Sequence, residues 1–270
     1  MSTNTIKTRS DDYLVTHLKE MAWHRAIIRS MEAKFFSRLS LERPILDVGC
    51  GDGHFASAIF AETLDAGIDV SEKILNEARQ INMYKELKIT SDNNIPYPDA
   101  SFLSVFSNCV IEHIPDQEKT LSEIARVMKP NGTFVFSTTS HLFESFLWIP
   151  RVFEKIGLKG LAGKYRKWFT KISVHFHYRS PEEWIELLGK HGFEVTSWKY
   201  YMSREAVKAF EISHYYGVFF LLCKKLFGKW ILFPSLVNTL NIDRCFRKYY
   251  EEDDIKEGAD LFFVCKRKGS

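Results

Sequence analysis

The sequence has few of the features that mark secreted or membrane-spanning chains. Its five cysteines are odd in number and scattered, and none forms a C-x-x-C pair. This usage favours a reducing cytoplasm over a disulfide framework. The first ten residues are polar, so no signal peptide is evident. No apolar run approaches the ~18 residues that would span a bilayer. We also find no internal repeat and no low-complexity tract. These absences indicate a globular chain, which we expect in the cytoplasm.

Basic charge is unevenly distributed along the 270 residues, whose net charge is +3. Residues 141–180 hold eight Lys and Arg against two Glu, and residues 215–250 hold six against one Asp. These windows carry +6 and +5, so the rest of the chain carries −8. The asymmetry predicts a basic face that meets an anionic partner.

A glycine-rich segment is the most informative stretch. An apolar run at 44–46 enters a loop with glycines at positions 49, 51 and 53, and a helical pattern follows. Strand, glycine-rich turn and helix are the layout of a nucleotide-type cofactor site. Glycine lets the backbone approach a ligand closely, and the helix N-terminus directs unpaired N–H groups at it.

The same loop departs from the dinucleotide fingerprint. It reads G-C-G-D-G rather than G-x-G-x-x-G, and the carboxylate of Asp52 would repel a pyrophosphate. An acidic loop suits a ligand that carries an ammonium group. Asp69 closes the next apolar run, where an acid can accept hydrogen bonds from both hydroxyls of a ribose. S-adenosylmethionine (SAM) offers an ammonium, a sulfonium and a ribose, and has no phosphate.

Five segments in order resemble the class I SAM-dependent methyltransferases, in particular their small-molecule group. The resemblance covers residues 40–140, with a tail at 176–201 and 260–268. It implies methyl transfer from SAM, with S-adenosylhomocysteine as the product. One departure is Leu103, where this group usually carries Asp after the Phe. The matching segments are residues 45–53, 67–71, 91–102, 107–114 and 123–132.

The resemblance also implies a cofactor site. The acid of the second segment, Asp69, would bind the ribose, and Asp92 would meet the adenine amine. Cys50 is expected as a small packing residue rather than a nucleophile. Tyr13 belongs to a helical N-terminal segment that, in the family, lies over the cofactor. The expected cofactor-binding residues are Asp47, Gly49, Cys50, Gly51, Asp69, Val70, Asp92, Asn93, Asn108 and Tyr13.

Two histidines are candidate general bases. His113 follows Glu112 after the fourth strand, and His141 closes the fifth. An unperturbed pKa of ~6.5 suits deprotonation of a hydroxyl or an amine. Either imidazole could instead be structural, because methyl transfer needs little acid–base help. His175 and His177 have a spacing that could hold a metal, but no carboxylate or third ligand is near in sequence, so we expect no metal.

Nucleic acid is not the expected acceptor. Enzymes that methylate exocyclic base amines carry an Asp/Asn-Pro-Pro-Tyr-like motif, whereas Asn108 is followed here by Cys-Val-Ile. Cys109 lacks the Pro-Cys or Thr-Cys context of an attacking thiolate, so we interpret it as a core thiol. RNA remains a weak alternative that rests on the basic windows alone.

We expect an α/β fold, a Rossmann-like doubly wound sheet that is mostly parallel with an antiparallel last strand. Residues 11–40 read as a helical lid. A helix should start at 180–183, where Ser precedes Pro. The expected strands are 45–48, 66–70, 87–90, 103–109, 133–138, 193–198 and 260–266, and the helices between them are 54–62, 72–81 and 117–128.

The chain reads as one domain, 1–270, in which two insertions form a cap that binds the acceptor. Residues 141–175 leave the regular pattern and are aromatic and basic, and 202–259 read as helical. Ten aromatic residues with interspersed lysines fill 215–250. That composition is typical of an interfacial helix, which would place the protein peripherally at the inner membrane face. A pocket wall or a homodimer face is the other interpretation.

Three hypotheses for function follow. The first is direct in-line methylation of an oxygen or nitrogen of an apolar or lipid-linked small molecule. The second is methylation of a soluble secondary metabolite or a sugar. The third is a partner protein that binds SAM without transferring its methyl group.

Overall fold

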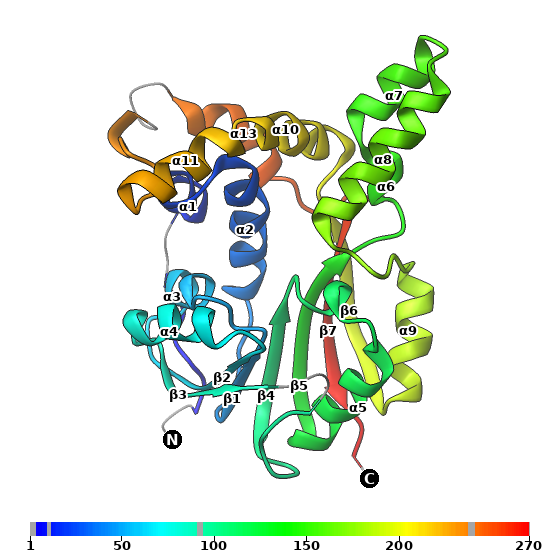
Figure 1. Cartoon of the computed structure of the whole chain (residues 1–270). Helices are drawn as coiled ribbons and strands as arrows, with labels where there is room; N and C mark the ends of the chain where they lie inside the picture. The colour runs from blue at the N-terminus through cyan, green and yellow to red at the C-terminus, as the bar shows by residue number, and fades with distance from the viewer. Residues whose placement is uncertain (1–3, 10–11, 91–93, 237–240, 270) are drawn as a thin grey trace.

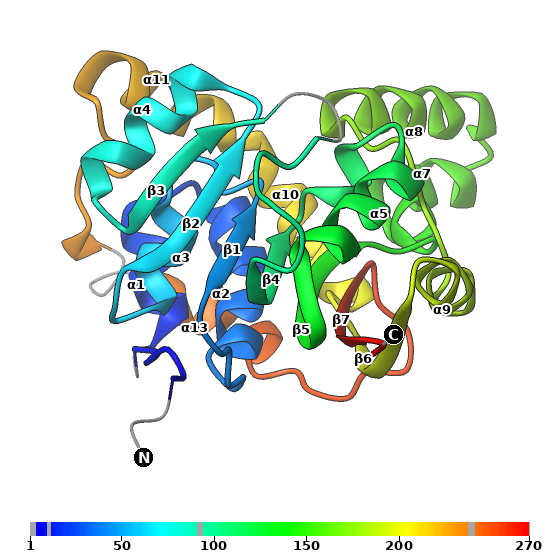
Figure 2. The same cartoon turned by 90° about the horizontal axis from the view of Figure 1, so that it is seen from below.

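One seven-stranded sheet organises the molecule, as Figure 1 and, from below, Figure 2 show. The computed structural model describes residues 4–9, 12–90, 94–236 and 241–269. The strand order is β3-β2-β1-β4-β5-β7-β6, and only the pairings of β7 are antiparallel. The doubly wound fold with an antiparallel last strand is therefore confirmed. The strands are β1 Ile45–Val48, β2 Leu64–Asp69, β3 Tyr84–Ile89, β4 Phe102–Asn108, β5 Met128–Thr139, β6 Phe193–Tyr201 and β7 Asp260–Arg267.

Two hydrophobic cores cover the two faces of the sheet, because successive strand residues point to opposite sides. Ile45 belongs to one core and Leu46 to the other. The first core holds α2 Trp23–Phe36, α3 His54–Ile59 and α4 Glu72–Ile81. The second holds α5 Gln117–Val127 and α9 Pro181–Lys190.

Local signals place several helix ends where the sequence predicts them. The Ser180 hydroxyl accepts a hydrogen bond from the Glu183 backbone N–H, and the Glu183 carboxylate accepts one from the Ser180 N–H. This reciprocal capping box starts α9 with Pro181 in the first turn. In the N-terminal lid, α1 Tyr13–Glu20 precedes α2. The break falls at Met21, whose backbone is extended.

Residues 141–175 are helical, which the sequence pattern did not predict. They form α6 Phe143–Phe146, α7 Trp148–Lys155 and α8 Lys159–Ser173. Gly157, at a φ of +82°, separates α7 from α8. Three glycines in 157–163 lower intrinsic helix propensity and hide the periodicity. Packing supplies the missing stabilisation, because Ala162 and Phe169 are buried.

The insertion before the last strand is helical, as predicted. It contains α10 Arg204–Tyr215, α11 Gly217–Phe227 and α13 Ile242–Tyr250. Its two ends meet where Tyr201 of β6 pairs with Asp260 of β7. In Figure 1 this insertion lies above α1 and α2, while α7 and α8 rise on the other side of the molecule. Two helical lobes therefore stand over the carboxyl ends of the strands.

Candidate active site

The glycine loop is tied to the neighbouring strand by its backbone. The N–H groups of Gly49 and Cys50 both donate to the Ile68 carbonyl oxygen, each at 2.9 Å. Gly49 has a φ of +76°, and a Cβ there would lie 2.5 Å from a methyl carbon of Val110. At Gly51 an added Cβ would meet no protein atom within 4 Å. The loop is therefore closed on its protein side and open above Gly51.

Asp69, the last residue of β2, lies beside this loop. Its Oδ2 accepts a hydrogen bond from the Gly51 N–H at 3.1 Å, and its Oδ1 accepts one from the Ser71 N–H at 3.0 Å. Each carboxylate oxygen has a further lone pair. Asp69 is thus held in a fixed orientation and can still accept two hydrogen bonds from a ligand.

Two buried groups lie under the loop. The Asp47 carboxylate accepts a hydrogen bond from the Tyr84 hydroxyl at 2.7 Å, and burial raises the pKa of Asp47 to about 7. An ammonium group beside Asp47 would favour its charged form. Burial also raises the pKa of the Cys50 thiol, which argues against a nucleophilic role.

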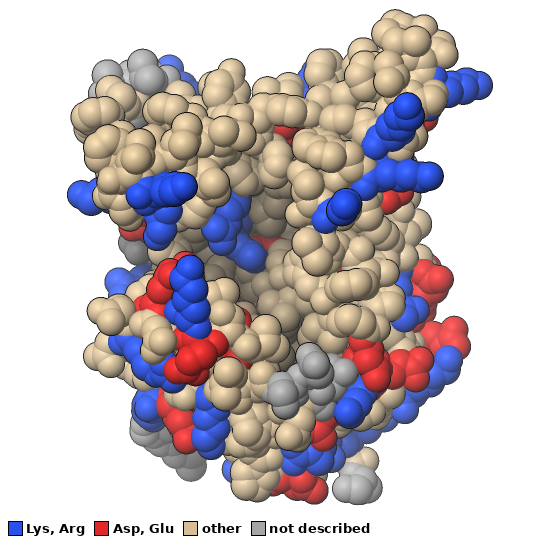
Figure 3. Space-filling view, in the orientation of Figure 1, with Lys and Arg blue, Asp and Glu red and all other residues tan. Residues whose placement is uncertain are grey.

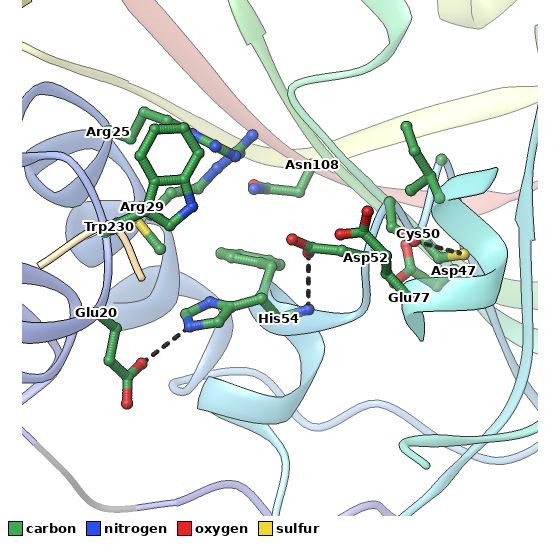
Figure 4. A pocket seen from close by; sticks show the side chains of 15 residues that line it. Glu20, Arg25, Arg29, Asp47, Cys50, Asp52, His54, Glu77, Asn108 and Trp230 are labelled. Atoms are coloured by element: carbon green, nitrogen blue, oxygen red, sulfur yellow. Dashed lines mark hydrogen bonds and ion pairs between the residues drawn. The ribbon is translucent and has the colours of Figure 1, made fainter. Parts of the chain in front are cut away.

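A first cavity of about 330 Å³ lies between the lid helices and the loop. Figure 4 shows the guanidinium groups of Arg25 and Arg29 on one side of it, with the carboxylates of Asp52 and Glu77 across from them. His54 pairs with Glu20 of α1 at 2.9 Å and links lid to loop. This cavity offers both signs of charge, as a zwitterionic amino acid would need.

A second cavity of about 520 Å³ lies on the other side of Gly49, which lines both. Asp69 stands in its wall, and its lining is more apolar than that of the first cavity. A carboxylate beside apolar side chains suits a nucleoside, whose sugar is polar and whose base has apolar faces. The apolar lining residues are Val48, Ile68, Val70, Ile95, Val110, Ile114 and Pro115.

A third cavity, of about 360 Å³, joins the other two. It shares Arg25 and Arg29 with the first and His113 with the second. Segments from both lobes line it, with Ile172 from α8 and Phe210 from α10. Its remaining lining residues are His24, Ile28, Cys109, Glu112, Thr139, Phe143, Ser173, His175, His214 and Asp260.

The titratable groups of the third cavity are mostly neutral at pH 7. Burial lowers the pKa of His24 to about 3 and that of His175 to about 4. Burial raises the pKa of Glu112 to about 8 and that of Asp260 well above its usual range. Apart from the guanidinium groups of Arg25 and Arg29, the cavity therefore offers neutral hydrogen-bonding groups, which suit a hydroxylated or amino-substituted ring.

A buried ion pair connects the lid to the strand ends. The Glu32 side chain is fully buried and pairs with Arg29 at 2.8 Å. It also accepts hydrogen bonds from the Asn108 amide and the Tyr201 hydroxyl, each at 2.8 Å, and from the Cys109 thiol. Burial opposes the charge on Arg29, but the Glu32 carboxylate outweighs it and raises the Arg29 pKa. Side chains from α2, from the end of β4 and from β6 thus converge on one carboxylate.

Of the two predicted bases, only His113 lies at the cavities. Its Nδ1 is 2.9 Å from the Val174 carbonyl oxygen, so Nε2 carries the lone pair when Nδ1 donates. His141 is exposed and lines none of the three cavities. The chain turns after Ser140, which bridges to Arg179, and this turn directs His141 outward.

The predicted cofactor residues are distributed unevenly. Asp47, Cys50, Gly51 and Asn108 line the first cavity, Asp69 and Val70 the second, and Gly49 both. Asp92 and Asn93 lie outside the described residues. Tyr13 does not line these cavities. Its ring is buried in the first core, and its hydroxyl donates to the Arg9 carbonyl, so Arg25 and Arg29 take the lid position expected for it.

One cluster was missed because His175 is far in sequence from the adjacent pair Glu112 and His113. Ligand atoms of Glu112, His113 and His175 lie within 4.8 Å of one another. His175 therefore has a carboxylate and a second imidazole nearby, whereas His177 lies against the Pro115 carbonyl. These groups can exchange a proton with one another or together hold a cation.

Comparison with known proteins agrees with this geometry. A family model described as a methyltransferase domain matches residues 40–188. A ubiquinone/menaquinone biosynthesis C-methyltransferase of Rickettsia akari is 32% identical over 215 residues, covering 70% of this chain and 83% of the relative. A ubiquinone biosynthesis O-methyltransferase of Coxiella burnetii is 25% identical over 185 residues, covering 66% of this chain and 75% of the relative.

Solved structures share the fold at low identity. A SAM-dependent methyltransferase of Thermotoga maritima matches with a TM-score of 0.55 and 18% identity over 91% of each chain. The cyclase SpnF matches with a TM-score of 0.56 and 16% identity, covering 98% of this chain and 87% of its own. A cyclase and a methyltransferase thus share this fold, so the fold alone does not decide the chemistry.

Proposed function

Because this chain belongs to the class I SAM-dependent methyltransferases, we propose that it methylates an oxygen or nitrogen of an apolar or lipid-linked small molecule. The observation that carries the proposal is the third cavity, which shares walls with both cofactor cavities and is lined by both lobes. The names of the relatives, which concern ubiquinone and menaquinone, support a lipid-linked acceptor.

The residues present fit the cofactor that the family uses. Asp69 has two free lone pairs for the ribose hydroxyls, and Val70 and Ile95 would flank the adenine. Arg25 and Arg29 would hold the carboxylate of the methionine part. When bound, SAM supplies an electrophilic methyl group. Asp92 and Asn93 remain the proposed partners of the adenine amine.

The acceptor would occupy the third cavity, between residues 141–175 and 202–259. We therefore propose these two segments as the acceptor-binding cap. Phe143 and Phe210, one from each segment, line the cavity and would hold the acceptor ring. Alignment of the acceptor atom and exclusion of water would supply most of the rate.

His113 is the proposed general base. Burial lowers its pKa below the ordinary 6.5, so its imidazole is neutral at pH 7 and can accept a proton at Nε2. The Val174 carbonyl at Nδ1 would hold the ring in place, and the Glu112 carboxyl group lies 4.0 Å from Nε2. A base is needed when the acceptor is a hydroxyl or a protonated amine. The other cavity residues would align the acceptor atom with the methyl group.

The polar lining of the third cavity supports a second candidate. Four imidazoles and two carboxyl groups would also hold a soluble secondary metabolite or a sugar. A lipid-linked acceptor needs the same polar contacts for its head group and apolar surface for its tail. The lipid-linked and the soluble acceptor therefore differ only in whether they carry an apolar tail.

Methyl-labelled SAM distinguishes these candidates. The protein is incubated with the label and a whole extract of the source cells, and the products are split between organic and aqueous phases. We expect label in the organic phase, and none from protein carrying Asp69→Ala. Label in the aqueous phase alone would overturn the lipid-linked acceptor in favour of a soluble one. No label, with SAM binding confirmed separately, would favour a non-catalytic SAM-binding protein.

Replacing His113 with Ala should lower kcat about a hundredfold, the usual contribution of a general base. Wild-type activity should rise with pH as the imidazole loses its proton, with a midpoint below 6.5. The variant should lose this acid limb. His141→Ala is the matched control and should change neither rate nor profile, because that side chain is exposed. An acid limb retained by His113→Ala would assign the base elsewhere.

A further inference from the structure

We propose that the two helical lobes above the acceptor cavity form a docking surface for an anionic lipid bilayer. The surface comprises α11 with its flanking residues 215–216 and 228–236, and α8 with its flanking residues 156–158 and 174–176. The inference goes beyond the proposed function, because it concerns where the protein sits. Binding to lipid vesicles tests it without any acceptor.

The first lobe exposes most of α11. Of its apolar side chains only Phe220 and Cys223 are buried, and Leu226 is 71% exposed. A monomer rarely leaves so large a contiguous apolar patch in water. The exposed apolar residues of this lobe are Tyr215, Tyr216, Val218, Phe219, Leu221, Leu222, Leu226, Phe227, Phe233 and Leu236.

The second lobe shows the same combination on another part of the chain. Ile156 is 63% exposed beyond the end of α7, and Phe176 is 56% exposed after α8. The two lobes are built from segments far apart in sequence, yet both stand on the same side of the sheet (Figure 1). The exposed apolar residues here are Ile156, Leu158, Leu161, Trp168, Ile172, Val174 and Phe176.

Both lobes are basic as well as apolar. Residues 217–236 and 159–176 contain lysines and no acidic residue. In Figure 3 tan and blue surfaces dominate both lobes, whereas most red side chains on this face lie below the hollow between them. Basic groups near an anionic membrane surface are attracted to it, and their contributions add. The exposed lysines are Lys159, Lys164, Lys167, Lys171, Lys224, Lys225 and Lys229.

A bilayer surface fits these features better than a membrane span or a second copy. α11 has 11 residues, or about 16 Å of helix, against a hydrocarbon core of about 30 Å. Among the described helices, none is long and apolar enough to cross a membrane. A two-fold dimer through either lobe would bring lysines against lysines, because such an interface repeats the same patch on both subunits.

The position of the cavity gives this surface a use. The third cavity lies between the lobes, with Ile172 from one and His214 from the other in its walls. Figure 3 shows the face hollowed at this place. If the acceptor is lipid-linked, as proposed above, its head group would enter from the membrane while its tail stays among lipids.

Vesicle flotation tests the surface directly. The full chain is mixed with phosphatidylcholine vesicles with or without phosphatidylglycerol. We expect binding to the anionic vesicles that weakens as salt is raised, because the attraction of exposed lysines is screened. The double variant Phe219→Ser with Leu226→Ser should bind at least tenfold more weakly. Ile185→Ser, an exposed position of α9 on another face, is the matched control and should bind like the wild type.

Each outcome decides the proposal. No binding of the wild type to anionic vesicles at low salt would overturn it, as would unchanged binding of the double variant. A wild-type dimer that the double variant converts to a monomer, without vesicle binding, would assign the surface to a second copy instead. SAM binding by every variant confirms folding. Vesicle binding without methyl transfer to any extract component would refute the proposed function and leave this surface in place.

Discussion

Replacing Glu32 with Ala is expected to lower the free energy of unfolding by about 3–5 kcal/mol, the usual result of removing one partner of a buried ion pair. The carboxylate is fully buried and neutralises Arg29 at 2.8 Å. It is also the acceptor for the Asn108 amide and the Tyr201 hydroxyl. The variant would leave a largely buried cation and these donors without their acceptor. Urea unfolding followed by circular dichroism measures the loss.

An exposed ion pair supplies the control. Arg38 is 54% exposed and pairs with Asp253 at 3.3 Å. Arg38→Ala should cost less than about 1 kcal/mol, because water replaces the lost contact. Adding Arg29→Met to the Glu32 variant should recover part of the stability, since the unpaired charge is then gone. Equal losses for the Glu32 and Arg38 single variants would show that Glu32 is not the charge that holds Arg29. If Glu32→Ala does not fold, Glu32→Gln allows the same comparison.

Replacing Asp69 with Ala is expected to weaken SAM binding about a thousandfold. Two hydrogen bonds from ribose hydroxyls to a carboxylate would be lost, at about 1.5–3 kcal/mol each, and every 1.4 kcal/mol is tenfold in Kd. The loop N–H of Gly51 would also lose its acceptor. Isothermal titration calorimetry with SAM gives the Kd. Asp69→Asn keeps one acceptor oxygen, so its Kd for SAM should lie between those of the wild type and of Asp69→Ala.

Glu186→Ala is the matched control for charge. Its carboxylate is 70% exposed and pairs with Lys190 within α9, and it lines none of the three cavities, so SAM affinity should not change. Urea unfolding without ligand separates lost binding from lost folding, and Asp69→Ala should unfold within about 1 kcal/mol of the wild type. If Asp69→Ala bound SAM within tenfold of the wild type, Asp69 would not be a cofactor residue, and another group would have to bind the ribose.

The arrangement of the glycine loop and Asp69 could be predicted because its geometry is local. Gly49 and Gly51 are fixed by the strand–turn–helix they belong to, and Asp69 by its place at the end of the next strand. In a parallel sheet both strand ends lie at one edge, so neighbours in the strand order are neighbours in space. Backbone rules and short spacings predict this arrangement, and the family resemblance supplied the ligand. Arg25 and Arg29 were not predicted, because the helical lid that carries them has no such local constraint.

The acceptor half could not be predicted, because it has no local signature. His24 lies in α2, His175 follows α8 and His214 lies in α10, and all three line the third cavity. Nothing near His24 or His214 in sequence distinguishes them from solvated histidines, and the spacing of His175 with His177 indicated only a possible metal. Arg29 and Glu32 read as an ordinary helical pair three residues apart, a spacing typical of an exposed face. The prediction that His141 lies at the substrate site was wrong, because the chain turns after Ser140 and directs this side chain outward.

The pairing of Tyr201 with Asp260 bears on how such a chain can diversify. The 58 residues between them leave the sheet at Tyr201 and return at its pairing partner Asp260. The hydrogen bonds between β6 and β7 therefore do not depend on the sequence of this inserted segment. Closing a loop of that length instead of a four-residue one costs only about 2–3 kcal/mol of entropy, since the penalty grows with the logarithm of length. If this segment selects the acceptor, as proposed, exchanging it would change specificity without altering the strand ladder. Any replacement must still cover the faces of α1 and α2 on which α10 and α13 now pack, and must replace Trp230 in the wall of the first cavity.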